Sequence, residues 1–346
     1  MKTFFNGEKQ NKDIKYNYSL LDANKVFSYA IILSPFISIF TFVLFLFISG
    51  LGGIDYDTLI NSSFAGYYSI VIISISILIL FLIYNKRNNI KPIYELGVKN
   101  KINIWFVLIS VLLGVGCIFL LAPFMNILFD VFGVQDQEMP FKMNSWYTII
   151  LGIVGYAFVP AVCEELIYRG VIQKGAEKRF TPFVAILIST SAFTLMHGSL
   201  QQTFYQVILG VVAGVLFYYG KNIIYSMVFH FLNNLTVCLF DLFGMPAYMN
   251  TGYWGGFWGV ALPILLFLAW CGIFVGLFFL IKHISKKHES KVEFIMEGQN
   301  IIYEEEHKKY GLKNLFSAQN HVEKMYFSFA FIVAIIIWIS NTIEGF

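Results

Sequence analysis

The chain has 346 residues, of which 58% are hydrophobic and only 13% are charged, with a formal net charge of +3. Soluble globular proteins have about 45–50% apolar and about 25% charged residues. The composition therefore excludes an ordinary soluble enzyme and a disordered chain, and the small net charge gives no basis for nucleic-acid binding. We predict an all-α, polytopic transmembrane helical bundle in the lipid bilayer.

Nine apolar segments are candidates for membrane spans, because a helix needs about 20 apolar residues to cross the hydrocarbon core. The first segment is too long for a signal-peptide core, and no small-residue cleavage site follows it, so we keep it as a span. In chain order the predicted spans are 26–49, 66–84, 104–129, 145–173, 182–198, 203–220, 222–240, 256–282 and 325–341.

Basic residues are concentrated in alternate connecting segments. Lysine and arginine are frequent in 1–25, 85–103, 174–181 and 283–324, whereas 50–65 and 241–255 contain neither. Because basic loops stay in the cytoplasm, nine spans place the amino terminus inside and the carboxyl terminus outside. Frequent asparagine, lysine and isoleucine suit a bacterial chain, so we expect a bacterial cell membrane.

Ionisable side chains inside spans are rare and usually functional, because each costs at least about 2.5–3.5 kcal/mol at the bilayer centre. Those placed deep in apolar runs here lie in the fourth, fifth and seventh predicted spans. They are Glu164, Glu165, Arg169, His197 and His230, with Asn233 and Asn234 about one turn after His230. This clustering predicts a site in the middle of the chain.

Helical spacing gives the two glutamates different neighbours. Glu165 and Arg169 are four residues apart on one face and can form an ion pair. Glu164 is turned about 100° away and lacks that partner, which suits a general base or acid. Pro160 removes a backbone hydrogen bond and can open the helix to water. The alternative, an ion-pair cluster that only stabilises the bundle, explains Glu165 and Arg169 but not Glu164.

The remaining polar groups suit hydrolysis. A carboxylate, two imidazoles and the Asn234 amide supply a base for water and donors for an oxyanion. Alternatively, Glu164, His197 and His230 could hold a zinc ion with an open water position. We favour the metal-free version, because Glu164 would have to act as both ligand and base while Glu165 is occupied by Arg169. Taken alone, a membrane histidine is more often a helix-to-helix hydrogen-bonding residue.

Three motifs in this order, Glu164-Glu165-xxx-Arg169, Phe193-xxx-His197 and His230-xxx-Asn234, resemble the CPBP family. These are the CAAX-type prenyl proteases and the bacteriocin-processing, or Abi-type, intramembrane proteases. The resemblance implies that Glu164 activates water and that Glu165, Arg169 and Phe193 support it. It further implies that His197 assists, and that His230 and Asn234 line the site and stabilise the oxyanion.

The resemblance divides the chain into three regions. Residues 1–144 form an amino-terminal cytoplasmic segment with three accessory helices, and 145–240 form the catalytic core. Residues 241–346 form carboxyl-terminal membrane helices with a cytoplasmic loop, 283–324, that we expect to carry one or two surface helices. The implied activity is that of an intramembrane glutamate-dependent endopeptidase that cuts a peptide or a membrane-anchored protein, with a metalloprotease as the open alternative.

Two other functions stay open. One is a non-proteolytic bacteriocin-immunity or regulatory scaffold that retains the motif. The other is a carrier with a proton or cation relay, although a carrier would have charges in more spans and paired broken helices.

The depth of the site residues in the membrane and a pair of glycines bear on how the predicted core is packed. Counted at about 1.5 Å per residue, Glu164 and His230 fall in the cytoplasmic half while His197 falls near the outer end of its span. They can meet if the fifth helix is tilted, or if 198–203 forms a re-entrant turn.

Gly210 and Gly214 make a GxxxG pattern, which we expect to pack helices within one bundle rather than to form a dimer.

Overall fold

The computed structural model describes residues 18–53, 63–132, 141–198, 200–243, 255–296 and 310–344. Within these residues all regular structure is helical, apart from one isolated bridge between Phe180 and Tyr310. Eight of the described helices are long and apolar enough to cross a membrane, and the remaining predicted span is the shorter apolar helix Pro182–Met196. The predicted all-α class is confirmed, and the chain is an integral, multi-pass membrane protein.

Most of the helices extend beyond the predicted spans at one or both ends, whereas Pro182–Met196 ends before the predicted end at 198. In chain order they are α1 (Leu20–Leu51), α3 (Ser63–Arg87), α4 (Pro92–Glu95), α5 (Ile104–Phe132), α6 (Trp146–Gly152), the π-helical η1 (Ile153–Phe158), α7 (Val159–Glu165), the π-helical η2 (Leu166–Gln173), α8 (Lys174–Glu177), α9 (Pro182–Met196), α10 (Leu200–Gly220), α11 (Ile224–Phe243), α13 (Gly256–Met296) and α14 (His321–Glu344). The first helix starts with a capping box, in which Ser19 and Asp22 satisfy each other's backbone N–H groups.

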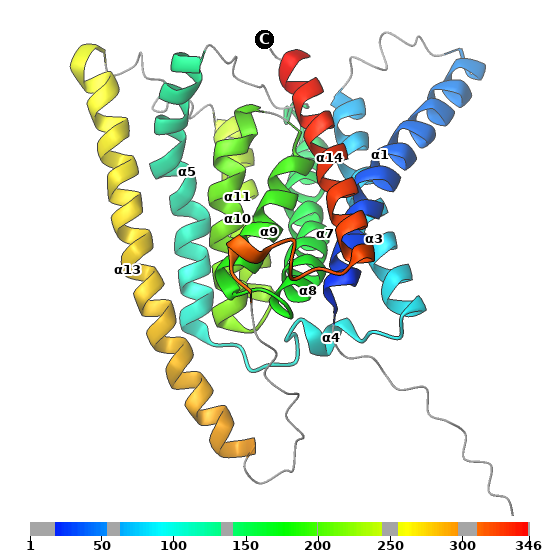
Figure 1. Cartoon of the computed structure of the whole chain (residues 1–346). Helices are drawn as coiled ribbons and strands as arrows, with labels where there is room; N and C mark the ends of the chain where they lie inside the picture. The colour runs from blue at the N-terminus through cyan, green and yellow to red at the C-terminus, as the bar shows by residue number, and fades with distance from the viewer. Residues whose placement is uncertain are drawn as a thin grey trace, which may run out of the picture.

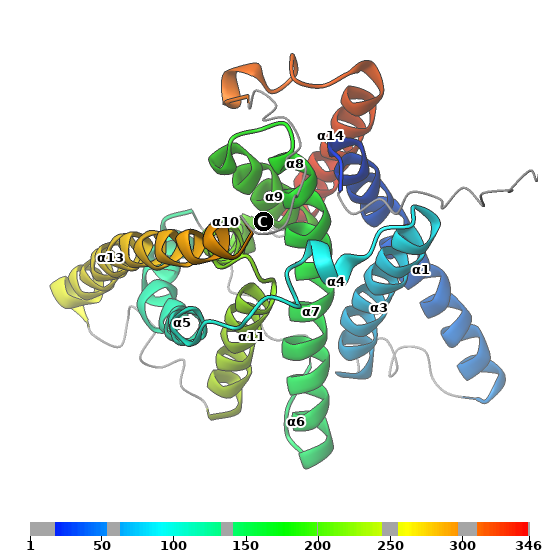
Figure 2. The same cartoon turned by 90° about the horizontal axis from the view of Figure 1, so that it is seen from below.

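The run from α6 to α8 forms a continuous column through the middle of the bundle (Figure 2). On one side of the column lie α11, α5 and α13, and on the other lie α3 and α1. The column packs directly against α11, α9, α3 and α1, and α10 packs against α9 and α11. The second half of the column, from α7 to α8, is mostly buried in protein, whereas α6 exposes residues such as Trp146 and Tyr147. The helix α13 lies at the edge of the bundle (Figure 1).

The basic connecting segments meet at the same end of the bundle. In Figure 1, α4 and α8 lie at the lower end, and the last helix, α14, ends at the upper end. The backbone N–H of Ile223 donates to the carbonyl of Leu96, and that of Tyr310 donates to the carbonyl of Arg179. This arrangement gives the bundle one basic end; that this end faces the cytoplasm stays a prediction.

One predicted loop is partly wrong. Residues 283–296 continue α13, which has 41 residues and is about 61 Å long, roughly twice the hydrocarbon thickness. The polar residues after 280 include lysine and glutamate, which favour helix, and no glycine or proline interrupts them before Met296. The part of the predicted loop at 297–309 lies outside the described residues.

Candidate active site

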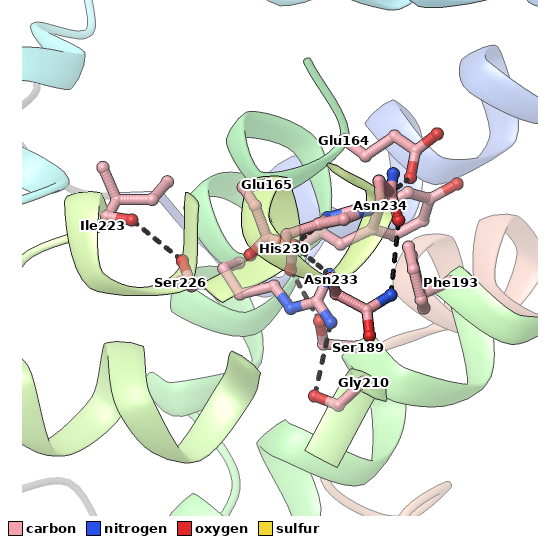
Figure 3. A network of polar contacts seen from close by, with 12 residues as sticks. Glu164, Glu165, Ser189, Phe193, Gly210, Ile223, Ser226, His230, Asn233 and Asn234 are labelled. Carbon is pink, nitrogen blue, oxygen red and sulfur yellow. Dashed lines mark hydrogen bonds and ion pairs between the residues drawn. The ribbon is translucent and has the colours of Figure 1, made fainter. Parts of the chain in front are cut away.

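The column places the two adjacent glutamates between its two π-helical segments. Glu164 and Glu165 are the last residues of α7, with η1 before and η2 after that short α-helix. A π-helical turn contains an extra residue and shifts the faces of the helix beyond it, and such turns are frequent at functional sites. In Figure 3 the side chains of Glu164, Glu165 and His230 converge between α7 and α11.

Glu165 is the buried centre of the network. Its Oε1 accepts hydrogen bonds from Arg169 Nη1 and from His230 Nδ1, each at 2.9 Å. The side chains of Glu165 and Arg169 are 0% and 1% exposed, so the ion pair expected from the i,i+4 spacing forms within the protein interior. Because the carboxylate only accepts, His230 carries its hydrogen on Nδ1 when neutral, which leaves a lone pair on Nε2.

Glu164 occupies a different environment. Its side chain is 18% exposed, and its Oε2 lies 3.8 Å from His230 Nε2. That distance is too long for a hydrogen bond. The same Oε2 atom is buried and has no protein hydrogen-bond partner. Glu164 therefore faces His230 with an oxygen that no protein donor occupies.

The ring of Phe193 joins three of the motif residues. Its centroid lies 4.6 Å from the ring of His197 and 5.8 Å from the ring of His230. The guanidinium carbon of Arg169 lies 4.6 Å from the same centroid, in a cation–π geometry. The motif residues of the column, α9 and α11 thus pack around one aromatic side chain.

Asn234 is anchored to the column. Its Nδ2 donates to the carbonyl of Tyr156 at 3.2 Å. Pro160 stands four residues after Tyr156 and has no N–H, so it cannot make the usual helical hydrogen bond to that carbonyl. Pro160 therefore cannot compete with Asn234 for the carbonyl of Tyr156. An amide nitrogen carries two hydrogens, and Asn234 keeps one for another acceptor.

The GxxxG pattern packs helices within the chain. Arg169 Nη2 donates to the carbonyl of Gly210 at 3.3 Å, and Gln173 Nε2 donates to the carbonyl of Gly214 at 3.1 Å. A Cβ on Gly210 would lie 2.7 Å from Thr190 Cγ2 of α9. The two glycines therefore let α10 approach both α9 and the column, and they expose the carbonyls that hold Arg169 and Gln173.

The short length of α9 brings His197 to the site. With 15 residues the helix is about 22 Å long, less than the hydrocarbon thickness of about 30 Å. His197 follows its last residue, and its Nδ1 lies 2.9 Å from the carbonyl of Phe193. Since α10 begins at Leu200, residues 200–203 form the first turn of a helix rather than part of a re-entrant turn.

The arrangement does not form a three-ligand metal site. Among the described residues, no three His, Cys, Asp or Glu side chains lie close enough to hold a metal ion. His230 and His197 each bind a neighbour through Nδ1 and keep Nε2 available, so the misfit lies in the spacing: together with Glu164 they are not gathered closely enough to share one ion. As placed, the candidate ligands do not fit zinc, and we assign no catalytic step to it.

Three residues that help to hold the site together were not predicted from the sequence. They are Tyr156, whose carbonyl holds Asn234, Tyr205, whose hydroxyl donates to Asn233 Oδ1 at 2.6 Å, and Gln173. Gln173 could have been found, because it is a polar residue four positions after Arg169 in an apolar span. The other two depend on contacts between helices, which spacing does not show.

The central residues match a known family model. Residues 145–236 match the model Rce1-like, described as type II CAAX prenyl endopeptidase Rce1-like. Over this segment the chain is similar to the Rce1-like members of the CPBP family. The match contains all three motifs that suggested the resemblance and indicates a CAAX-type intramembrane endopeptidase. No curated protein and no solved structure matches the chain.

Proposed function

We propose that this Rce1-like domain hydrolyses peptide bonds with Glu164 as the general base, on a peptide or membrane-anchored protein substrate. The observation that carries the proposal is the difference between two adjacent carboxylates. Glu165 is fully buried and binds Arg169 and His230, whereas Glu164 is partly exposed and keeps Oε2 free of protein donors. Glu164 is the carboxylate that can reach both water and substrate.

The proposed reaction uses the facing acceptors of Glu164 and His230. A water molecule between Glu164 Oε2 and His230 Nε2 can donate to both atoms. Its oxygen bonds to the scissile carbonyl carbon while its proton moves to Glu164. The carbonyl π electrons become an oxyanion, which the remaining N–H of Asn234 stabilises. Collapse of this intermediate breaks the C–N bond, and the departing amine takes the proton from Glu164.

The other motif residues support these groups in the proposal. Glu165 fixes the tautomer of His230, and Arg169 balances the charge of Glu165. The Nδ1 of His197 is engaged by the carbonyl of Phe193, which leaves Nε2 as its remaining polar ring atom for assisting proton transfer. The proposal takes the metal-free version, which is supported by Glu165 being occupied by Arg169 and His230 and by the need for Glu164 as the base.

The proposal is tested with purified protein in liposomes. The probes are a quenched fluorescent peptide ending in Cys-aliphatic-aliphatic-X, the same peptide farnesylated on cysteine, and a reporter anchored by one membrane helix. We expect the wild type to cleave at least one probe and Glu164→Gln to lose about a hundredfold or more of that rate. Glu323→Gln is the control, because Glu323 is a glutamate that is more deeply buried, at 4% exposure, but lies at the start of α14 and outside the site.

The outcomes separate the remaining alternatives. Near-normal turnover by Glu164→Gln contradicts the mechanism. No cleavage of any probe by folded wild type favours the scaffold function. Elemental analysis and a chelator test the metal: stoichiometric zinc with reversible chelator inhibition contradicts the metal-free version. Activity at background zinc content supports it.

A further inference from the structure

A chain of side-chain hydrogen bonds runs from α10 to the column through α11. The hydroxyl of Tyr205 donates to Asn233 Oδ1 at 2.6 Å, Asn233 Nδ2 donates to Asn234 Oδ1 at 3.4 Å, and Asn234 Nδ2 donates to the carbonyl of Tyr156 at 3.2 Å. Asn233 is 1% exposed. The chain begins in α10 and ends on the backbone of the column, at the carbonyl of Tyr156 in η1.

This chain determines which way two amides face. Asn side chains have an oxygen that accepts and a nitrogen that donates, and a flip exchanges them. The Tyr205 hydroxyl donates to the oxygen of Asn233, which leaves the nitrogen of Asn233 facing Asn234. Asn234 then presents its oxygen to Asn233 and its nitrogen to Tyr156. The carbonyl of Tyr156 fixes the orientation of the Asn234 amide at one end of the chain, and the Tyr205 hydroxyl holds Asn233, and through it Asn234, from the other end.

We propose that Tyr205 is a positioning residue that acts through Asn233 to aim the second N–H of Asn234 at the oxyanion. The inference rests on the proposed function for the role of Asn234 and adds to it a residue outside the three motifs. Tyr205 does not contact the reacting atoms in this assignment. A misplacement of about 1 Å at a catalytic group can cost about a hundredfold in rate, so the loss of one anchoring hydroxyl is measurable.

The first test removes only the hydroxyl. Tyr205→Phe keeps the ring and is expected to lower kcat about 10- to 100-fold with KM within about twofold, because the oxyanion forms only in the transition state. The probe is the peptide or reporter that the wild type cleaves. Tyr219→Phe is the matched control in α10, where the ring of Tyr219 packs against Tyr218 and Phe278, and it is expected to keep wild-type kinetics.

A double-mutant cycle shows whether Tyr205 acts through Asn234. Asn234→Ala is expected to cost about two to three orders of magnitude, the effect of losing one oxyanion donor. On that background, Tyr205→Phe is expected to change kcat by less than about twofold, because the group that it positions is gone. An equal loss on both backgrounds, or no loss on the wild-type background, overturns the proposal.

A measurement without activity separates this proposal from the proposed function. In protein labelled with ¹⁵N-asparagine, the side-chain NH₂ signals of Asn233 and Asn234 are assigned by their absence from the respective alanine variants. Tyr205→Phe is expected to shift both pairs, whereas Tyr219→Phe leaves them in place. An unmoved Asn234 pair overturns the positioning role even if the enzyme is active. Shifted pairs in a protein in which Glu164→Gln stays active support the positioning and contradict the proposed base instead.

Discussion

The helices α11 and α13 have opposite relations to the bilayer. The most apolar 18-residue stretch of α11 has a mean hydropathy of 1.3 with 39% of its residues buried, whereas that of α13 has 2.8 with 11% buried. The helix α11 carries His230, Asn233 and Asn234, and each of these side chains is hydrogen-bonded to a neighbouring helix. The helix α13 exposes large apolar side chains, including Phe257 and Leu265. Polar groups occur at membrane depth where other helices satisfy them, and apolar surface faces lipid elsewhere.

The largest expected effect comes from breaking the buried ion pair of the polar region. Arg169→Ala leaves the carboxylate of Glu165 buried without its cation, and Glu165→Gln leaves the guanidinium without its anion. Each should lower the free energy of unfolding by about 3–5 kcal/mol, measured by denaturant titration in detergent, and should lower activity as well.

A matched ion pair on the same column serves as the control for that prediction. Lys174 and Glu177 lie 3.6 Å apart with side chains 27% and 12% exposed. Lys174→Ala should cost about 1 kcal/mol or less, because a partly exposed pair is weakened by solvent. Equal effects at Arg169 and Lys174 would show that the Glu165 pair is not buried together.

The next prediction applies one substitution to both kinds of helix surface. Leu209 of α10 is 2% exposed, whereas Leu265 of α13 is 54% exposed. Leu209→Ala should cost about 2–5 kcal/mol because it leaves a cavity between packed helices. Leu265→Ala should change stability by about 0.5 kcal/mol or less and leave activity unchanged. A cost at Leu265 equal to that at Leu209 would mean that α13 is covered by protein rather than by lipid.

The smallest predicted effect concerns the carbonyl that anchors Asn234. Pro160→Ala supplies an N–H four residues after Tyr156, which competes with Asn234 Nδ2 for that carbonyl. We expect kcat to fall about tenfold while KM and thermal stability stay close to those of the wild type, since one oriented donor is loosened. Val159→Ala, one residue earlier in α7, is the control. An unchanged kcat in Pro160→Ala would show that the absence of an N–H at residue 160 does not matter for the hydrogen bond from Asn234 to Tyr156.

Sequence reasoning found most of the fold because the bilayer makes span length and composition strict. All nine predicted spans correspond to helices, and the basic segments meet at one end of the bundle. It was wrong about 283–296, because the length of an apolar run does not show that polar helix-forming residues can extend a helix into water. It also did not predict the π-helical turns on both sides of α7, which depend on packing and have no marked sequence pattern.

The sequence by itself determined the membrane class, the spans and the pairing of Glu165 with Arg169, because these follow from composition and from residues four apart on one helix. It also identified the cluster that the Rce1-like match covers. Tertiary structure alone decided that Glu165 binds His230, 65 positions away, that Asn234 reaches Tyr156, 78 positions away, and that Tyr205 holds Asn233. Helical geometry fixes local neighbours, whereas contacts between distant residues depend on how far each helix turns and how closely it packs. In this protein the π-helical turns change how far the column turns, and the glycines of α10 allow its close packing.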